Sequence, residues 1–314
     1  MARILVIGGG LIGCGWAAAF AGAGHDVVVS DPDPKVSLRL EELWRAAQPV
    51  MASLETLRDD VVAPKHVLSF EGLTDIEMVQ EALPEDLDLK HRVLAALEQQ
   101  IADHVPIVSS SSGFTPQMIA QSLARPERAF IAHPCNPPYL MPTVELVGHS
   151  STSKQILDRA EAFFSDMGKT VLRMARPVRG HLLNRLQFAL WREAVHLVET
   201  GVASMADVER AVTEGLAPRW CLMGPGGVFH LSGGTEGMAG YLCALGEATT
   251  EIWADLGTPN LVTAGAALTL GIQDTDPRPV LTLAGARDAA LPSLMQALKP
   301  IKADYYSKGE RENE

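Results

Sequence analysis

The chain has 314 residues, of which 47% are hydrophobic and 20% charged, a composition typical of a folded protein with about two domains. Its formal net charge of −12 disfavours nucleic acids and anionic membranes as partners, because both bind positive protein surfaces. The four cysteines are Cys14, Cys135, Cys221 and Cys243. Their wide spacing excludes a CxxC zinc pair and a disulfide framework, so we expect a cytoplasmic protein.

One uncharged stretch, from Ile4 to Gly24, could be mistaken for a secretory leader. Its many glycines, and the strand-like residues 3–7 at its start, favour a folded segment instead. The rest of the chain contains no uncharged apolar run of about 18 residues or more. The sequence therefore predicts no membrane-spanning helix.

Short β-branched runs alternate with helical stretches along the first part of the chain. Strands are predicted at residues 3–7, 26–31, 66–70, 78–83, 105–111, 129–134 and 143–148. Helices are predicted at residues 11–24, 34–62, 84–101 and 153–168. Strands that alternate with helices indicate βαβ units and a parallel sheet.

The character of the sequence changes at about residue 180. From there on, helical stretches follow one another, at residues 182–201, at 205–216 and then to about Leu298, and the final residues 308–314 are expected to form a solvated tail. We therefore predict an α/β protein with an N-terminal Rossmann-type, doubly wound domain at residues 1–180. An all-helical substrate and dimerisation domain follows at residues 181–314.

A glycine-rich loop, Gly8-x-Gly10-x-x-Gly13, directly follows the first predicted strand and opens the first predicted helix. In this motif the first glycine permits a tight turn, the second lets a pyrophosphate approach the backbone, and the third allows close helix–sheet packing. The helix N-terminus also offers free N–H groups and a positive dipole end. These glycines, with Leu11 and Ile12 between them, are therefore assigned to a dinucleotide site.

Asp31 ends the second strand, at the ~20-residue distance from the loop that dinucleotide-binding folds show. A carboxylate there accepts hydrogen bonds from the adenosine ribose hydroxyls and repels the 2′-phosphate of NADP. No arginine follows it at once. NAD is therefore the predicted cofactor; FAD is the main alternative, although flavoproteins usually have a larger chain and a second cofactor motif.

A histidine, His133, lies in the proline-rich run "AHPCNPPYLMPTVELV". A metal site needs several converging ligands, and no HxH, HxxxH or HExxH pattern joins this residue, so no metal is expected. Three other polar residues stand out: Ser112 ends a predicted strand within "SSSSG", Glu145 interrupts an apolar strand, and Asn184 opens the helical region. Each has an ordinary structural explanation when it is taken alone.

Taken together, "SSSSGFTP", "AHPCNPPYLMPTVELV" and "GHLLNRLQFAL" resemble the L-3-hydroxyacyl-CoA dehydrogenase superfamily. The resemblance is greatest to its short branch, which includes L-gulonate 3-dehydrogenase (lambda-crystallin) and L-carnitine dehydrogenase. It implies that His133 is a general base oriented by Glu145, and that Ser112 and Asn184 bind the reacting oxygen. It also implies a homodimer that packs through the helical domain.

The same resemblance places Asn136 in the active-site turn and Glu81 near the nicotinamide. A small hydroxy acid needs a cation for its carboxylate, and Arg219 in "GLAPRW" is the candidate. The candidate walls of the substrate site are Tyr139, Trp220 and Phe229.

The expected activity is NAD-dependent oxidation of the 3-hydroxyl of a small 3-hydroxy acid, as in L-gulonate 3-dehydrogenase. The alternatives are an L-carnitine 3-dehydrogenase and a short-chain 3-hydroxybutyryl-CoA dehydrogenase. An alternative of another class is a non-catalytic, crystallin-like or NAD-sensing protein. A small-molecule substrate is the expected partner in the first three cases.

Overall fold

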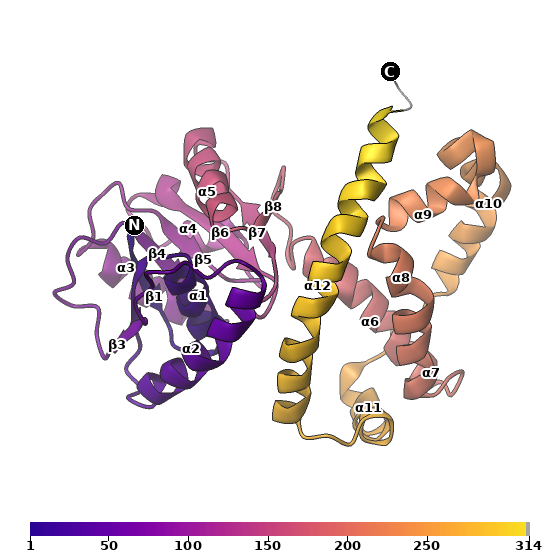
Figure 1. Ribbon diagram of the computed structural model, residues 1–314, viewed down its shortest axis with the longest axis horizontal. Coiled ribbons are helices and arrows are strands. Elements are labelled where there is room, and N and C mark those ends of the chain that lie inside the picture. Colours follow the sequence, from indigo (N-terminus) through magenta and orange to yellow (C-terminus); the bar gives the residue numbers. More distant parts are fainter. Residues whose placement is uncertain (312–314) are drawn as a thin grey trace. The chain divides into compact units, whose positions relative to one another are not determined.

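The computed structural model describes the backbone of residues 1–311 and the side chains of residues 1–307. The chain divides into two compact units, Met1–Arg185 and Leu186–Glu314. The first unit runs from indigo to pink in Figure 1, and the second from pink to yellow. No helix in the described part of the chain is long and apolar enough to cross a membrane.

The first unit is built on one eight-stranded sheet with the strand order β3-β2-β1-β4-β5-β6-β7-β8. The strands are β1 (Arg3–Ile7), β2 (Asp26–Ser30), β3 (Lys65–Val67), β4 (Met78–Glu81), β5 (Ile107–Ser109), β6 (Ala129–Pro134), β7 (Thr143–Val147) and β8 (Thr170–Arg173). The order runs outward in both directions from the adjacent strands β1 and β4, which makes the sheet doubly wound and creates a crevice at their carboxyl ends. The predicted Rossmann-type fold is confirmed.

Two features of the sheet differ from the prediction. Strand β7 pairs with β6 in the antiparallel direction, whereas all other neighbours are parallel. Residues 135–142 connect the two strands, and this segment is too short for the crossover of a dozen or more residues that a parallel pair needs. Strand β8 was not predicted, because its side chains are exposed or only half-buried at the sheet edge.

Five helices accompany this sheet (Figure 1): α1 (Leu11–Gly22), α2 (Val36–Ser53), α3 (Leu87–Glu98), α4 (Pro116–Ala120) and α5 (Lys154–Asp166). Helix α2 is shorter at both ends than the predicted 34–62, and α4 was not predicted. Helices α3, α4 and α5 begin at the side-chain caps Asp86, Thr115 and Ser153, which satisfy otherwise free N–H groups.

The core of the first unit is formed by apolar strands and the nearly fully buried helix α1. The helix packs against α5 through aromatic side chains: the Trp16 ring stacks on Phe20 with 5.0 Å between centroids and lies 5.6 Å from the Phe164 ring. Strand residues such as Leu5, Val79 and Ile107 have no exposed surface. The carboxyl ends of these strands are therefore held on a rigid base.

The second unit contains no strand within its described residues, so the predicted all-helical character is confirmed. Its elements are α6 (Leu183–Glu199, whose first residues belong to the first unit), α7 (Met205–Arg210), a π-helical turn (Ala211–Leu216), α8 (Ala217–Trp220), α9 (Pro225–Ser232), α10 (Gly237–Asp255), α11 (Leu261–Thr275) and α12 (Val280–Arg311). The last of these continues beyond the predicted helix end at about Leu298. The predicted tail at 308–314 is thus helical up to Arg311, and the rest of it lies outside the described residues.

Candidate active site

The glycine-rich loop between β1 and α1 has the geometry that the sequence predicted. Gly8 has φ +99°, which L side chains rarely adopt. A Cβ atom on Gly8 would lie 2.6 Å from the Ala82 oxygen, and one on Gly13 would lie 1.8 Å from the Gly8 oxygen. Nothing lies within 4 Å of the corresponding position on Gly10. Gly8 and Gly13 are therefore required for packing, whereas Gly10 leaves open space above the helix N-terminus.

A cavity of about 320 Å³ lies over this loop. It is lined by Gly8, Gly10, Leu11, Ile12, Asp31, Asp33, Val36, Arg39, Ala82, Leu83 and Pro84. Helix α1 has no side-chain cap at its N-terminus, so its first N–H groups remain available to an anion. These residues fit a dinucleotide: the uncapped helix end would hold the pyrophosphate, and Asp31 would bind the ribose.

Asp31 is held rigidly at the edge of this cavity. Its Oδ2 accepts a hydrogen bond from the Gly9 N–H at 2.7 Å, and its Oδ1 accepts one from the Asp33 N–H at 2.9 Å. Arg39 also reaches the cavity from α2, where its Nη1 donates to the Gly9 oxygen at 2.9 Å. Arg39 was not predicted as a site residue, because it does not follow Asp31 directly but lies eight positions further on, in the first turn of α2.

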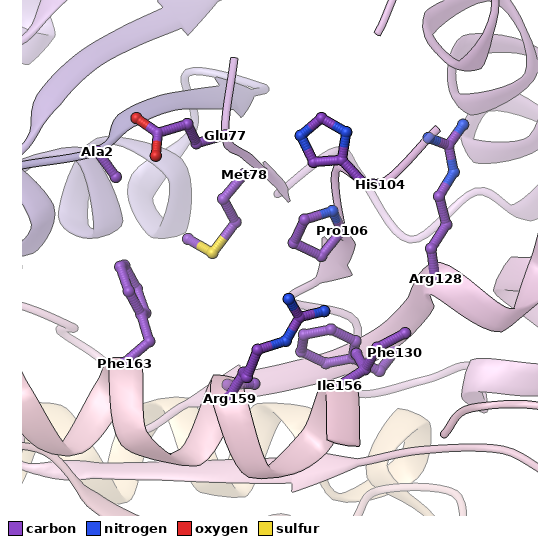
Figure 2. Close-up of a pocket in the computed structure, with 11 residues that line it drawn as sticks. Ala2, Glu77, Met78, His104, Pro106, Arg128, Phe130, Ile156, Arg159 and Phe163 are labelled. Atoms are coloured by element: carbon purple, nitrogen blue, oxygen red, sulfur yellow. The ribbon is translucent and has the colours of Figure 1, made fainter. Parts of the chain in front are cut away.

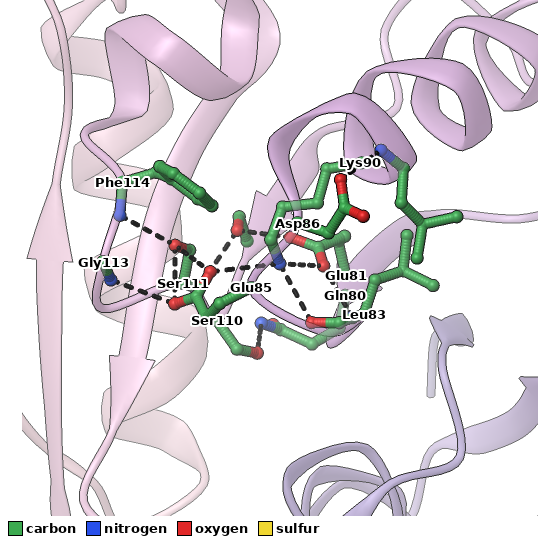
Figure 3. A network of polar contacts seen from close by, with 12 residues as sticks. Gln80, Glu81, Leu83, Glu85, Asp86, Lys90, Ser110, Ser111, Gly113 and Phe114 are labelled. Atoms are coloured by element: carbon green, nitrogen blue, oxygen red, sulfur yellow. Dashed lines mark hydrogen bonds and ion pairs between the residues drawn. The ribbon is translucent and has the colours of Figure 1, made fainter.

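Glu81 ends strand β4 and has no exposed surface. Its Oε1 accepts hydrogen bonds from Lys90 Nζ and the Leu83 N–H, both at 2.6 Å, and its Oε2 accepts one from Ser109 Oγ at 2.5 Å (Figure 3). Both oxygens are therefore engaged by protein donors. Through one of these bonds Glu81 holds the cavity-lining residue Leu83, and its expected position near the nicotinamide stays a prediction.

Glu85 is the acidic residue of this network that faces the serine loop, residues 109–113 (Figure 3). Its Oε1 accepts hydrogen bonds from the N–H groups of Ser112 and Gly113 at 2.8 and 2.9 Å, and Ser111 Oγ lies 2.8 Å from its Oε2. Burial raises the pKa of Glu85, but the Gly113 N–H, the Lys90 ammonium and the two serine donors hold it below its ordinary value. Glu85 was not predicted as a site residue, although it follows β4 at the same sheet edge as the serines.

His133 and Glu145 form the central pair of the site. They are directly opposite residues in the register of β6 and β7, and 2.7 Å separates His133 Nδ1 from Glu145 Oε2. The fully buried Glu145 also accepts hydrogen bonds through Oε1 from the N–H groups of Leu182 and Leu183, at 2.6 and 2.8 Å. Because a carboxylate only accepts hydrogen bonds, Nδ1 of His133 carries a proton, and in the neutral imidazole the free lone pair is therefore on Nε2.

The charge of Glu145 is stabilised despite its burial. Burial raises the pKa of Glu145, but the His133 bond and the N–H groups of Leu183 and Leu182 outweigh it and hold the pKa below the ordinary value. The carboxylate is therefore ionised at neutral pH and can stabilise an imidazolium on His133.

Hydrogen bonds also join the segments that carry Ser112 and Asn184. The Gly180 N–H donates to the Ser112 oxygen at 2.9 Å, and Asn184 follows Leu183, whose N–H holds Glu145. Both side chains are half-buried, and neither makes a hydrogen bond within the described residues. The chain thus gathers all four predicted catalytic residues within its first unit, at segments that are bonded to one another.

The turn between β6 and β7 carries two predicted substrate residues. Asn136 is exposed, and Tyr139 is only 8% exposed; that these residues contact the substrate stays a prediction. Lys169 holds this turn by donating to the carbonyl oxygens of Pro138 and Met141. Lys169 was not predicted as a site residue.

The remaining predicted substrate residues lie in the second unit. Arg219 and Trp220 are on α8, and Phe229 is on α9. Their contribution to a site around His133 stays a prediction.

A second cavity, of about 290 Å³, lies at the opposite, amino-terminal edge of the sheet. Figure 2 shows it between the sheet and α5, bordered by Met78, Pro106, Phe130, Arg159 and Phe163. It contains none of the predicted site residues. Among the described residues, no group of three or more His, Cys, Asp or Glu side chains is placed to hold a metal ion.

A dinucleotide cradle and a buried His–Glu pair at the carboxyl edge of one Rossmann-type sheet define an NAD-dependent dehydrogenase. The chain belongs to the 3-hydroxyacyl-CoA dehydrogenase family: residues 3–177 match its NAD binding domain and residues 180–265 its C-terminal domain. The resemblance predicted from the sequence motifs is thereby confirmed.

Among curated proteins, the chain is similar to the L-carnitine dehydrogenase of Streptomyces griseus, with 39% identity over 94% of this chain and 89% of the relative. It is also similar to that of Oceanobacillus iheyensis, with 38% identity over 83% of this chain and 86% of the relative. Among solved structures, a 3-hydroxyacyl-CoA dehydrogenase from Archaeoglobus fulgidus matches with a TM-score of 0.60 and 29% identity over 74% of this chain and 75% of that one. An NAD-dependent 5-formyl-3-hydroxy-2-methylpyridine 4-carboxylic acid 5-dehydrogenase shares the fold, with a TM-score of 0.83 and 24% identity over 95% of this chain and 99% of that one.

Proposed function

We propose that this dehydrogenase oxidises the 3-hydroxyl of a small 3-hydroxy acid, and that L-carnitine is the first substrate to test. The observation that carries the chemistry is the 2.7 Å contact between His133 Nδ1 and Glu145 Oε2, which leaves Nε2 of His133 free to accept a proton. The choice of substrate is supported by the names of the similar curated proteins. Those names give no support to the gulonate expectation.

In this proposal His133 is the general base. Its Nε2 takes the proton of the substrate alcohol, and Glu145 stabilises the imidazolium that forms. A base of this kind contributes about 10²–10⁴-fold to the rate. The unpartnered side chains of Ser112 and Asn184 hydrogen-bond the reacting oxygen and hold it near His133.

The cofactor-binding role falls to the loop after β1. The N–H groups at the start of α1 and the open space over Gly10 bind the pyrophosphate, and Asp31 binds the adenosine ribose. When bound, NAD supplies the acceptor for the hydride that leaves the alcohol carbon. The chain's own residues orient the substrate and remove the proton.

L-Carnitine carries a carboxylate and a trimethylammonium group, and these need a cation and aromatic rings respectively. We assign the carboxylate to Arg219 and the quaternary amine to Trp220 and Phe229. The Phe229 ring already lies 5.1 Å from the Tyr241 ring, and both Trp220 and Phe229 have exposed surface. Gulonate has no quaternary amine, so it would gain nothing from these rings.

The second unit supports a homodimer as part of the proposal. It exposes large apolar side chains on several helices, among them Phe188, Leu242, Trp253, Val262 and Leu281. Apolar surface of this kind marks protein interfaces. The acidic net charge and the free cysteines are consistent with a cytoplasmic location.

NADH formation tests the proposal directly. The purified protein is assayed with NAD and L-carnitine, D-carnitine, L-gulonate, L-3-hydroxybutyrate or 3-hydroxybutyryl-CoA. We expect L-carnitine to give the highest kcat/KM, D-carnitine to be inactive, and His133→Ala to lose turnover while NAD binding is unchanged. A higher kcat/KM for gulonate or the CoA ester would replace L-carnitine as the proposed substrate. Turnover that survives in His133→Ala would refute the mechanism. NAD binding without turnover of any compound in the panel would favour the non-catalytic alternative.

A further inference from the structure

His181 is a buried histidine that the proposed chemistry does not use. It lies just before α6 in an unusual backbone conformation, with φ +47°, and its side chain has no exposed surface. Positive φ values are strained for residues other than glycine, and they persist where the surroundings fix them. The position is therefore held by specific contacts.

The His181 ring bonds to the serine loop. Its Nε2 lies 2.9 Å from the backbone oxygen of Ser111. A carbonyl oxygen only accepts hydrogen bonds, so Nε2 must carry the proton, and this fixes the tautomer. The other ring nitrogen, Nδ1, is buried and has no hydrogen-bond partner within the described residues.

The backbone around His181 bonds to the other side of the site. We call residues 180–183 the strap. Its first N–H, from Gly180, donates to the Ser112 oxygen at 2.9 Å. Its last two, from Leu182 and Leu183, donate to Glu145 Oε1. The strap thus bonds to both the serine loop and the carboxylate that orients His133.

The His181 ring is also a close neighbour of the His133 ring, with 5.2 Å between the centroids. The charged or titratable groups facing it are His133 on β6 and Glu145 on β7, and Glu85 is bonded to Ser111 in the serine loop. Burial lowers the pKa of His181, the Ser111 bond and Glu145 raise it in part, and His133 lowers it further. His181 is therefore neutral at neutral pH.

We infer that His181 is a positioning residue of this dehydrogenase: its neutral ring joins the serine loop to the strap and so fixes Ser112 and Glu145 around His133. The inference rests on the proposed role of His133. A donor is needed at this position because the Ser111 oxygen would otherwise be buried without one. A neutral donor is needed because a second cation beside His133 would oppose formation of the imidazolium.

Two substitutions separate the parts of this role. His181→Phe keeps a ring of similar size but removes the donor, and His181→Asn keeps a side-chain N–H on a shorter side chain. We expect His181→Phe to lower kcat about 10- to 100-fold, the range for loss of one buried hydrogen bond, with little change in the Kd for NAD. We expect His181→Asn to recover part of that loss. The thermal midpoint of each variant shows that it is folded.

Two further readouts respond to positioning and not to stability alone. The first is the downfield proton resonance of the His133–Glu145 hydrogen bond, assigned by its absence in Glu145→Gln; we expect it to shift or broaden in His181→Phe. The second is the pH profile of kcat, whose acid limb should change in the same variant because it lacks the second imidazole. A kcat within about twofold of the parent, or an unchanged resonance, would overturn the inference.

The failure of this inference can be distinguished from failure of the proposed function. The resonance reports on the His133–Glu145 geometry whether or not His133 is the base. If His133→Ala retains turnover, the proposed function fails, even if His181→Phe shifts the resonance. If His133→Ala is inactive and His181→Phe is as active as the parent, only the role of His181 fails.

Discussion

Glu145 faces His133 across the antiparallel strands β7 and β6, and 2.7 Å separates Glu145 Oε2 from His133 Nδ1. The antiparallel register sets this pairing, because opposite residues of adjacent strands project toward the same face. The other oxygen of the carboxylate is fixed by two backbone N–H groups. Both oxygens of Glu145 are thus committed, and the His133 ring has one favoured orientation.

Glu145→Gln tests this orientation. An amide does not stabilise the imidazolium, and its N–H₂ group can stabilise the wrong tautomer of His133. We expect kcat to fall about 10²–10⁴-fold, as when a catalytic histidine loses its carboxylate. The measurement is kcat and KM for the best substrate, with NAD affinity as the control for folding. A kcat that stays near the parent value would show that Glu145 does not assist the base.

Glu145→Gln also tests how the stability of the folded protein depends on pH. The pKa of Glu145 lies below its ordinary value of 4.5, so the unfolded chain binds the proton more tightly than the folded one. Its contribution to stability is therefore present above pH 4.5 and is lost as the pH falls through the lower folded pKa. In thermal denaturation, we expect the advantage of the parent over Glu145→Gln to shrink in acid. A difference in thermal midpoint that is constant with pH would contradict the depressed pKa of Glu145.

The lowered pKa of Lys169 predicts that protein stability changes with pH in the alkaline range. Burial lowers the pKa of Lys169 to about 8 from 10.5. Between these values the unfolded chain holds a proton that the folded chain has lost, so this residue makes stability rise with pH. We expect Lys169→Met to remove that rise from the thermal midpoint between pH 8 and 10.5. Lys154→Met is the matched control, because Lys154 is an exposed lysine in the same unit, and it should keep the slope of the parent.

Lys169 also holds the turn after His133, through the carbonyl oxygens of Pro138 and Met141. We therefore expect Lys169→Met to lower kcat/KM about tenfold, since two buried acceptors lose their donor. Lys154→Met should leave kcat/KM unchanged. Equal activity in the two variants would show that the turn holds its shape without the ammonium.

Cofactor choice is predicted to depend on Asp31. Its carboxylate lies at the cavity edge, bonded to the Gly9 N–H, where it would repel the 2′-phosphate of NADP. Arg39 reaches the same cavity and can pair with that phosphate once the carboxylate is gone. We expect Asp31→Ser to raise the ratio of kcat/KM for NADP over NAD by about tenfold or more. Adding Arg39→Ala should reverse this gain. An unchanged ratio in Asp31→Ser would show that the adenosine ribose does not bind at Asp31.

The parts of the site that the sequence predicted are those with local patterns. The loop from Gly8 to Gly13 has fixed spacing, and Asp31 follows it at the distance set by one βαβ unit. His133 and Glu145 were found through family motifs, and the structure shows why they belong together: a short connection makes their strands antiparallel partners.

The residues that were missed act through long-range contacts. Glu85 bonds to Ser112 across 27 positions, Lys169 to Pro138 across 31, and His181 to Ser111 across 70. Each of the three is charged or titratable, and such residues usually lie on the protein surface. The hydrophobic periods of 2 and 3.6 residues that mark strands and helices do not single them out. Only the folded sheet edge brings these side chains to their partners.

Glu85 provides the last test of how the serine loop is held. Its oxygens accept hydrogen bonds from the N–H groups of Ser112 and Gly113 and from the hydroxyl of Ser111, so Glu85 fixes the loop whose Ser112 side chain is proposed to bind the substrate. Glu85→Gln removes the negative charge and leaves one accepting oxygen where the carboxylate has two. We expect kcat/KM to fall about 10-fold or more, because bonds to a charged acceptor are worth roughly 1.5–3 kcal/mol each.

The matched control for this test is Glu41→Gln, since Glu41 is an exposed carboxylate of the same unit whose one ion pair among the described residues is with Arg45. This variant should retain the parent's kcat/KM, because an exposed pair contributes little. Double substitution of Glu85 and Ser112 tests whether the two act together: if Glu85 works through the Ser112 loop, Glu85→Gln should cost much less in a Ser112→Ala background. Full additivity of the two effects would mean that Glu85 supports the site by another route, such as its contact with the buried Lys90 ammonium.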